Sequence, residues 1–213
     1  MRAVSAHAPR RSLAGRPEAT SHAEIEQAAF RLFGERGFDH TTLDDIAAAV
    51  GVSRRTLFRY FRSKNDIPWG QFDHTLEHFR RILRDLPQDL PTHEVVQRGV
   101  LAFNEFDDEA DPPHRERMRL ILETPALQAH SVLRYAEWRA VIAEYVAERL
   151  DLNPVDPLPE TAGHVCLALA ISAYVLWLRD AGAGLHARLE QTLADLRTYL
   201  AGEDGQAPDM GRL

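Results

Sequence analysis

The stretch TTLDDIAAAVGVSRRTLFRYF, residues 41–61, decides the fold of the N-terminal part of this chain. It holds two short segments with helical apolar periodicity. Residues that favour helix N-termini precede them, Thr42 before the first and Ser53 before the second. Gly51 and Val52 stand between the segments. The pattern predicts two short helices joined by a tight turn, a helix-turn-helix whose second helix is free to enter a groove.

A further helix is predicted before this pair. Ser21 and Glu24 have the spacing of a capping box, and an apolar stripe with 3–4 spacing follows them. The stripe stops at Gly37, a residue type that commonly ends helices. With the last helix of the motif expected over residues 54–61, the sequence predicts a three-helix DNA-binding unit over residues 21–64.

The rest of the chain is helical by period, without an alternating run of the strand type. Ser63 is expected to cap a helix over residues 64–85 that stops before Pro87, and prolines mark a loop at 151–159. The other predicted helices cover residues 92–107, 113–123, 130–150, 160–179 and 185–201. The predicted fold is all-α with about nine helices, in which a C-terminal ligand-binding and dimerisation domain (65–201) follows the N-terminal unit.

The charge is distributed unevenly along the chain. The 213 residues carry a net charge of −7, but residues 1–64 hold eleven Lys or Arg against seven Asp or Glu, a net charge of +4. The remainder therefore carries −11. This division favours an anionic partner for the N-terminal part alone. Residues 1–20 are predicted to be a flexible basic arm or a tail without function, and residues 202–213 a disordered polar tail.

Cysteine usage and apolar runs limit the class of protein. One cysteine, Cys166, excludes an intramolecular disulfide framework and a Cys-rich zinc module. The N-terminus has arginines but no apolar segment of a secretory signal. The longest apolar run, Val165–Leu178, has 14 residues, whereas a membrane-spanning helix needs about 20. We therefore expect a cytoplasmic protein without a membrane partner, in which this run is a buried helix and Cys166 a packing residue.

The motifs around the helix-turn-helix occur together in one known family. The text AAFRLFGERGFDHTTLDDIAAAVGVSRRTLFRYFRSKNDI contains an apolar helix ending in ERG-F, then TT-x-DDIA, GVS and TL-x-x-YF-x-SK. It resembles the DNA-binding domain of TetR-family transcriptional regulators. NDIPWG (65–70) and PALQAHSVLRYAEWR (125–139) also resemble the TetR-type regulators associated with mycofactocin biosynthesis clusters. The resemblance implies a ligand-responsive regulator, typically a repressor, that binds double-stranded DNA as a homodimer.

The last helix of the motif carries residues suited to DNA. Arginine pairs with guanine O6 and N7, and a threonine methyl group suits the thymine methyl group. Tyrosine, lysine and a threonine at a helix N-terminus suit phosphate. The residues predicted to contact bases are Arg54, Arg55, Thr56 and Arg59, and those predicted to contact phosphates are Thr42, Tyr60 and Lys64. We expect Leu57, Phe58 and Phe61 to face inward. The alternative for Arg54, Arg55 and Arg59 is that they form a solvent-exposed helix face without a role in DNA binding.

One short recognition helix reads few base pairs, so we expect a homodimer on a palindromic operator with half-sites about 34–36 Å or more apart. The last two predicted helices would form its interface, because the first of them is apolar on nearly all sides. Family analogy implies a four-helix bundle there. The predicted interface residues are Val165, Leu169, Val175, Leu176, Leu178, Leu189, Leu193 and Leu196. The alternative is that the helix over 160–179 is the core helix of a single body.

The resemblance also implies that the C-terminal domain encloses a small hydrophobic effector, such as a long-chain acyl-CoA. The predicted lining residues are Phe103, Phe106, Met118, Trp138 and Tyr145, although aromatic residues at helical spacing are usually core. The candidate contacts for CoA phosphates are Arg80, Arg81 and Arg84, or Arg115, Arg117 and Arg119. We expect the effector to move the helix over residues 64–85 and thereby to change the spacing of the two recognition helices.

Two other functions remain as alternatives. His74, Glu77 and His78 match the H-x-x-E-H pattern of a zinc hydrolase, but no distal acidic ligand is identifiable, and ten histidines make chance matches frequent. The other alternative is an architectural DNA-binding protein without an effector. GAGLHA at 182–187 fits a dinucleotide pattern but follows a helix rather than a strand. The sequence predicts no enzyme, no metal and no cofactor.

Overall fold

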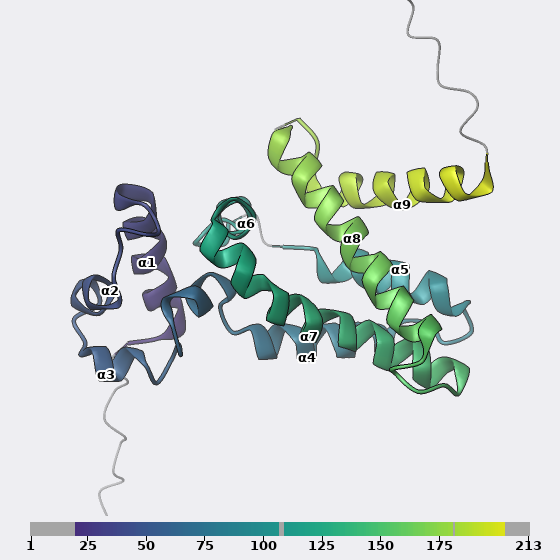
Figure 1. Cartoon of the computed structure of the whole chain (residues 1–213), viewed down its shortest axis with the longest axis horizontal. Helices are drawn as coiled ribbons and strands as arrows, with labels where there is room; N and C mark the ends of the chain where they lie inside the picture. The colour runs from purple at the N-terminus through teal and green to yellow at the C-terminus, as the bar shows by residue number, and fades with distance from the viewer. Residues whose placement is uncertain (1–19, 107–108, 181, 203–213) are drawn as a thin grey trace, which may run out of the picture.

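The computed structural model describes residues 20–106, 109–180 and 182–202, and these residues form helices and no strands (Figure 1). The N-terminal elements, called the head, are α1 (His22–Arg36), α2 (Leu43–Ala49), α3 (Arg54–Leu57) and the 3-10 helix η1 (Lys64–Trp69). The remaining helices, called the body, are α4 (Phe72–Asp85), α5 (Thr92–Phe103), α6 (His114–Glu123), α7 (Pro125–Leu150), α8 (Pro157–Arg179) and α9 (Leu185–Ala201). The predicted all-α fold with about nine helices is confirmed. The predicted arm and tail lie outside the described residues, except for Thr20 and Gly202.

The head is built as the sequence motifs predict. The capping box at Ser21 begins α1, and Thr42 with Asp45 forms a second capping box at α2. Gly51 in the turn has a φ of +69°, a left-handed conformation that glycine adopts without the penalty of a Cβ atom. Fully buried apolar side chains from every element close the core of the head; they include Ile25, Ala29, Ile46, Leu57 and Ile67.

The second helix of the motif is shorter than predicted. α3 ends at Leu57 rather than near residue 61, because the following turn is closed by amide groups that bond three residues back instead of four. Leu57 and Phe61 are buried, as expected. The expected inward direction of Phe58 is wrong, since this tight turn leaves its ring 44% exposed.

The single helix predicted over residues 64–85 is also wrong. η1 and α4 meet at a corner formed by Gly70, whose φ is +59°. Pro68 within η1 has no N–H group with which to extend an α-helical ladder. Ser63 does not cap the backbone of η1; its hydroxyl donates instead to the carboxylate of Asp66 at 2.8 Å.

Two long helices organise the body. In Figure 1, α7 and α4 run along the bottom of the body, α8 crosses over α7, and α6 lies between the head and the remaining helices. The ring of Trp138 on α7 stacks on Phe79 of α4 at 5.3 Å, and Val141 and Ile142 are fully buried beside them. α7 begins at Pro125 rather than at residue 130, because proline is favourable in the first turn of a helix.

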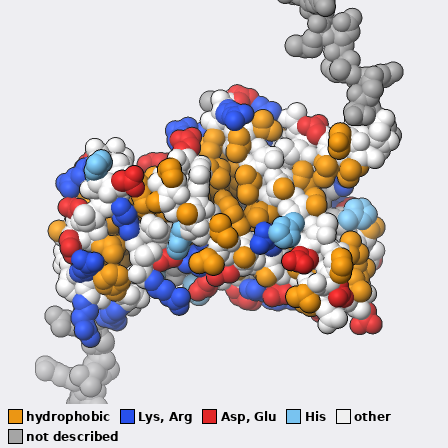
Figure 2. All heavy atoms as spheres, viewed as in Figure 1, with side chains coloured by type: hydrophobic (Ala, Val, Ile, Leu, Met, Phe, Trp, Pro, Cys, Tyr) orange, Lys and Arg blue, Asp and Glu red, His pale blue; other side chains and the backbone are white. Residues whose placement is uncertain are grey.

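α8 is much less buried than predicted. Its buried residues are mainly small, such as Gly163 and Ala173, while Val165 and Leu176 are exposed. By length and composition alone α8 could cross a membrane, and only 22% of its most apolar window is buried. The alternative that the helix over residues 160–179 is the core helix of a single body therefore does not fit α8. Figure 2 shows the apolar side chains that gather on this face of the body.

Candidate nucleic-acid interface and ligand cavity

Three arginines are exposed at the end of the head that carries α3. Arg54, Arg55 and Arg59 all point away from the head core, and Figure 2 shows Lys and Arg side chains gathered at this corner of the molecule. Arg54 donates to Asp44 at 3.2 Å, and its guanidinium lies 5.5 Å from the centre of the exposed Phe58 ring. Thr56 is half-buried beside them. These side chains form a positive, sterically free edge of the kind that enters a DNA groove.

The structure gives Lys64 a different role from the expected phosphate contact. Its ammonium donates to the backbone carbonyls of Phe38 at 2.6 Å and Thr41 at 2.9 Å, and it lies 4.2 Å from the centre of the Phe38 ring. Burial lowers the pKa of Lys64, and the charge of Asp39 partly offsets this shift. Lys64 therefore fastens the start of η1 to the loop between α1 and α2.

The two other predicted phosphate contacts also form hydrogen bonds within the head. The hydroxyl of Tyr60 donates to the carbonyl of Thr20 at 2.7 Å, and its ring packs edge-on against His22. The hydroxyl of Thr42 donates to the Asp45 carboxylate at 2.5 Å within the capping box. That carboxylate already occupies the helix N-terminus where a phosphate was expected.

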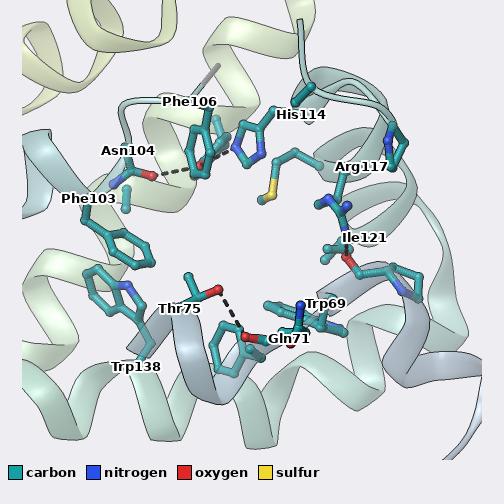
Figure 3. A pocket seen from close by; sticks show the side chains of 18 of the residues that line it. Trp69, Gln71, Thr75, Phe103, Asn104, Phe106, His114, Arg117, Ile121 and Trp138 are labelled. Atoms are coloured by element: carbon teal, nitrogen blue, oxygen red, sulfur yellow. Dashed lines mark hydrogen bonds between the residues drawn. The ribbon is translucent and has the colours of Figure 1, made fainter. Parts of the chain in front are cut away.

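A cavity of about 350 Å³ lies between the head and the body (Figure 3). Phe103, Phe106, Met118 and Trp138 line it, as the sequence predicts. Tyr145 does not line it: this side chain is buried in the core of the body, and its hydroxyl donates to Gln88 at 3.2 Å. The placement of Tyr145 in the ligand site is thus corrected, because its position on α7 faces the start of the α4–α5 loop.

A chain of buried polar groups forms one wall of the cavity. Tyr174 donates to the amide oxygen of Asn104 at 2.6 Å, and His114 Nε2 lies 2.9 Å from the same tyrosine hydroxyl. Burial, with a smaller contribution from the charge of Arg117, lowers the pKa of His114 to about 3. Burial also raises the pKa of Tyr174. His114 is therefore a neutral donor, since the single proton of the tyrosine is committed to Asn104.

The first of two polar joints connects the head to the body. Arg117 of α6 donates to Glu26 of α1 at 2.6 Å and to the carbonyl of Pro68 at 2.7 Å, and its guanidinium lies 5.2 Å from the centre of the Phe30 ring. Glu26, Pro68 and Arg117 all line the cavity. No local sequence signal points to this joint, because its ion pair links residues that are 91 positions apart.

The second joint centres on Asp66 of η1. Its carboxylate accepts hydrogen bonds from Ser63, from Arg134 at 2.8 Å and from His130 at 3.0 Å. Burial acts to raise the pKa of Asp66, but the hydrogen bonds from Ser63 and Arg134 and the nearby His130 hold it below its ordinary value. Asp66 lies in NDIPWG, and His130 and Arg134 lie in PALQAHSVLRYAEWR. The two motifs that carry the resemblance to one group of TetR-type regulators therefore contact each other. Their joint presence in the sequence was the one signal that could have pointed to this joint.

The arginines considered for CoA phosphates are largely occupied. Arg80 and Arg84 pair with Glu77, and Arg115 donates to the carbonyl of Trp177 at 2.5 Å near the end of α8. With Arg117 in the first joint, the structure leaves Arg81 and Arg119 exposed but on separate helices. Neither predicted triplet forms a phosphate cradle, because ion pairs and carbonyls within the chain take up their donors.

A second hollow, a groove of about 580 Å³, lies between α5, α8 and α9. It is lined by predicted interface residues, namely Val165, Leu169, Leu189, Leu193 and Leu196. Leu189 is only 1% exposed and belongs to a core between α8 and α9, so its assignment to a surface between chains is corrected. Val175, Leu176 and Leu178 lie beyond the groove toward the end of α8, where Leu176 is exposed. Burial raises the pKa of Cys166, which also lines the groove, to about 11, in keeping with a packing thiol.

The zinc-hydrolase pattern has no metal-binding geometry behind it. His74 and His78 are exposed on α4, and the carboxylate of Glu77 is paired with Arg80 and Arg84. Within residues 20–106, 109–180 and 182–202, no three His, Cys, Asp or Glu side chains are grouped as metal ligands.

Two family models match this chain. The model for bacterial regulatory proteins of the tetR family matches residues 25–67, and the model for the MftR C-terminal domain matches residues 90–201. The chain is 43% identical over 177 residues to the mycofactocin biosynthesis transcriptional regulator MftR of Mycobacterium tuberculosis, covering 83% of this chain and 89% of that protein. It is 31% identical to the regulator TcmR of Streptomyces glaucescens, over 59% of this chain and 58% of TcmR.

Solved structures show the same fold. Thermus thermophilus FadR, a TetR-family repressor in complex with lauroyl-CoA, has a TM-score of 0.55 at 23% identity, over 91% of this chain and all of that one. A TetR-family regulator from Syntrophomonas wolfei has a TM-score of 0.61 at 14% identity, over 85% of this chain and 95% of that one. The resemblance expected from the motifs is confirmed: the chain belongs to the TetR family of transcriptional regulators, which are not enzymes, and carries a C-terminal domain of the MftR type.

Proposed function

We propose that this chain is a cytoplasmic, ligand-responsive repressor that binds a palindromic operator as a homodimer and leaves it when a hydrophobic effector binds. The observation that carries the DNA part is the exposed edge of α3. Arg54, Arg55 and Arg59 are all exposed there, and of the three only Arg54 is paired within the described residues, with Asp44 at the surface, whereas Tyr60 and Lys64 bond to backbone carbonyls of the head. Exposed arginines on and directly after a short helix suit base and phosphate contacts in a major groove.

The effector part rests on the cavity and on its position. An aromatic space of about 350 Å³ adjoins both the head and the body, so a bound ligand would touch elements of each. A long-chain acyl-CoA is a suitable candidate, with its acyl chain inside, and the related FadR fold was solved with lauroyl-CoA. The ligand shifts the protein from its DNA-bound state only if it binds the DNA-free state more tightly.

The dimer part rests on the exposed apolar surface of α8 and the adjoining groove. Val165, Leu176 and the groove residues Leu169, Leu193 and Leu196 would be covered by a second copy of the chain. Leu196→Glu should convert a dimer to a monomer in sedimentation, and Leu133→Glu on α7, an exposed apolar site outside the groove, is the matched control. An unchanged dimer in Leu196→Glu would remove the groove from the interface.

DNase footprinting on the upstream region of the gene tests the whole proposal. We expect one protected palindrome whose protection weakens on addition of lauroyl-CoA. Protection without sequence preference, unaffected by the ligand, would favour an architectural DNA-binding protein instead. If no acyl-CoA changed operator affinity in a gel-shift titration, the acyl-CoA assignment would fail while the repressor assignment stood.

A further inference from the structure

Arg117 belongs both to the wall of the cavity and to a bond between the head and the body. One terminal nitrogen donates to Glu26 of α1, and the other to the carbonyl of Pro68. The side chains of Arg117 and Glu26 are mostly buried, with 19% and 12% of their surfaces exposed. This ion pair therefore closes α1 onto α6 and faces the ligand space at the same time.

The two sides of the cavity differ in chemistry (Figure 3). Phe103 and Trp138 lie on one side, and Trp69, Arg117 and Ile121 lie on the opposite side. Arg117 is the one Lys or Arg among the lining residues that the structure describes. The buried indole N–H of Trp69, next in sequence to Pro68, has no hydrogen-bond partner in the described part of the chain. A ligand with an apolar tail and oxygen acceptors at one end matches this division.

An anion at Arg117 conflicts with Glu26. With Glu26 in place, the positive charge of Arg117 is already balanced, so a second anion leaves an excess negative charge in a mostly buried site. Such a charge is unfavourable unless a partner neutralises it. The conflict is relieved when Glu26 leaves Arg117, and α1 then loses its ion pair with α6.

The second joint, between Asp66 and Arg134, lies outside the cavity, so a bound ligand would not contact it. Neither Asp66 nor Arg134 lines the cavity. A ligand at Arg117 therefore opens one joint and leaves the other closed, which reorients the head without detaching it from the body.

We propose that the effector carries an anionic oxygen head group, a carboxylate or a phosphate, on an apolar chain, and that it releases DNA by displacing Glu26 from Arg117. This inference rests on the proposed function, since it names the effector class and its point of action. The aromatic side of the cavity holds the chain.

Calorimetric titration of the full chain with three probes tests the ligand class. The probes are dodecanoate, lauroyl-CoA and the neutral dodecanol. In Arg117→Gln we expect dodecanoate to bind about tenfold or more weakly, the loss of one charge-assisted contact, and dodecanol to bind as in the wild type. In Glu26→Gln we expect dodecanoate to bind about threefold or more tightly, because the competing charge is gone. Arg98→Gln and Glu94→Gln are matched controls, since they break an exposed Arg–Glu pair of the same 2.6 Å length on α5.

The outcomes separate the ligand class from its source and from the repressor assignment. The proposal would be overturned if Arg117→Gln lost the same affinity for dodecanol as for dodecanoate, or if Glu26→Gln bound dodecanoate with unchanged affinity. Arg117→Lys, which keeps the charge, should restore part of the dodecanoate affinity, and thermal melts verify that each variant is folded. If only the affinity for lauroyl-CoA depends on Arg117, the head group at this residue is a phosphate. If only the affinity for dodecanoate depends on it, the head group is a carboxylate.

Fluorescence anisotropy with the footprinted operator tests the action on DNA. Dodecanoate or lauroyl-CoA should lower operator affinity in the wild type, and the effect should shrink in Glu26→Gln. Ligand binding with the predicted dependence on Arg117 but an undiminished effect on DNA in Glu26→Gln would overturn the displacement of Glu26. Absence of operator binding by the ligand-free wild type would instead overturn the proposed function.

Discussion

The head and the body use their side chains in opposite ways. In the head, Lys64, Tyr60 and Thr42 bond to groups of the head itself, and Arg55 and Arg59 point into solvent, where a partner can reach them. In the body, the apolar packing is incomplete: its helices form most of the wall of a cavity of about 350 Å³ at the border with the head, and α8 is largely uncovered. The head is complete as a single chain, whereas the body has two apolar surfaces that other molecules can fill.

This difference explains a division of labour. A surface that reads DNA must keep one geometry, and internal hydrogen bonds to Phe38 and Thr41 hold it. A module that responds to a ligand must have states of similar free energy, and unfilled apolar space provides for them. Four predictions test whether the division is correct, beginning with the largest effect.

Phe79→Ala should strongly destabilise the body. Phe79 is fully buried and packs on both Phe103 and Trp138 beneath the cavity. We expect a loss of about 3–5 kcal/mol in the free energy of unfolding, measured by urea denaturation. A loss below about 1 kcal/mol would mean that the core around Phe79 is also loosely packed and can rearrange to fill the space left by the ring.

Lys64→Met should destabilise the head, because it leaves two carbonyls without their donor. We expect a loss of about 2 kcal/mol in the free energy of unfolding. If Lys64 instead contacted phosphate, stability would change little, and the slope of log affinity against log salt would fall by about one. Denaturation and salt-dependent binding on the same variant decide between the two roles.

Arg55→Ala should leave stability within about 0.5 kcal/mol, because the side chain is exposed. Its expected effect is on DNA, a loss of about 1–3 kcal/mol in operator affinity and a relaxed base preference. Competition with operators mutated one base pair at a time measures both. Equal weakening on every sequence would assign Arg55 to phosphate rather than to a base.

Acidification should destabilise the body through His114. Its pKa is about 3 in the folded chain and near 6.5 in an unfolded one. Between these values the unfolded chain binds the additional proton, so stability falls as the pH falls, by about 1 kcal/mol per pH unit. His114→Gln, which keeps a donor for Tyr174, should lack this part of the slope in urea denaturation between about pH 6.5 and 5. If the wild type and His114→Gln showed the same dependence of unfolding free energy on pH, His114 would not be a buried neutral histidine.

The sequence predicts elements better than it predicts their relations. The start of α1, its end at Gly37 and the bounds of α9 were predictable, because caps and periodicity are local signals. The break at Gly70 was missed although Pro68 and Gly70 are local signals for the end of a helix, because the prediction treated both as part of one helical pattern. Phe58 was misplaced for a similar reason, because a regular helix was assumed where the structure has a tight turn.

The candidate site divides in the same way. The family resemblance pointed to a ligand site in the body, and four of the five residues named for it line the cavity, while the motif pattern pointed to the exposed arginines at α3. No spacing rule pairs Glu26 with Arg117, or Asp66 with Arg134, because these contacts depend on how separate helices pack. The predicted interface included Leu189 because periodicity shows an apolar face without showing which neighbour covers it.

The corner at Gly70 has a mechanical consequence. A continuous helix over residues 64–85 would be a stiff rod about 33 Å long that imposes every rotation of the body on the head. The rod is divided at Gly70, whose φ is +59°, so no continuous helical hydrogen-bond ladder joins η1 to α4 over residues 64–85. A Cβ atom at this position would lie 3.2 Å from the carboxylate of Glu26. The angle between η1 and α4 therefore depends on side chains such as Glu26 around the corner, and a larger residue at position 70 would have to displace that carboxylate.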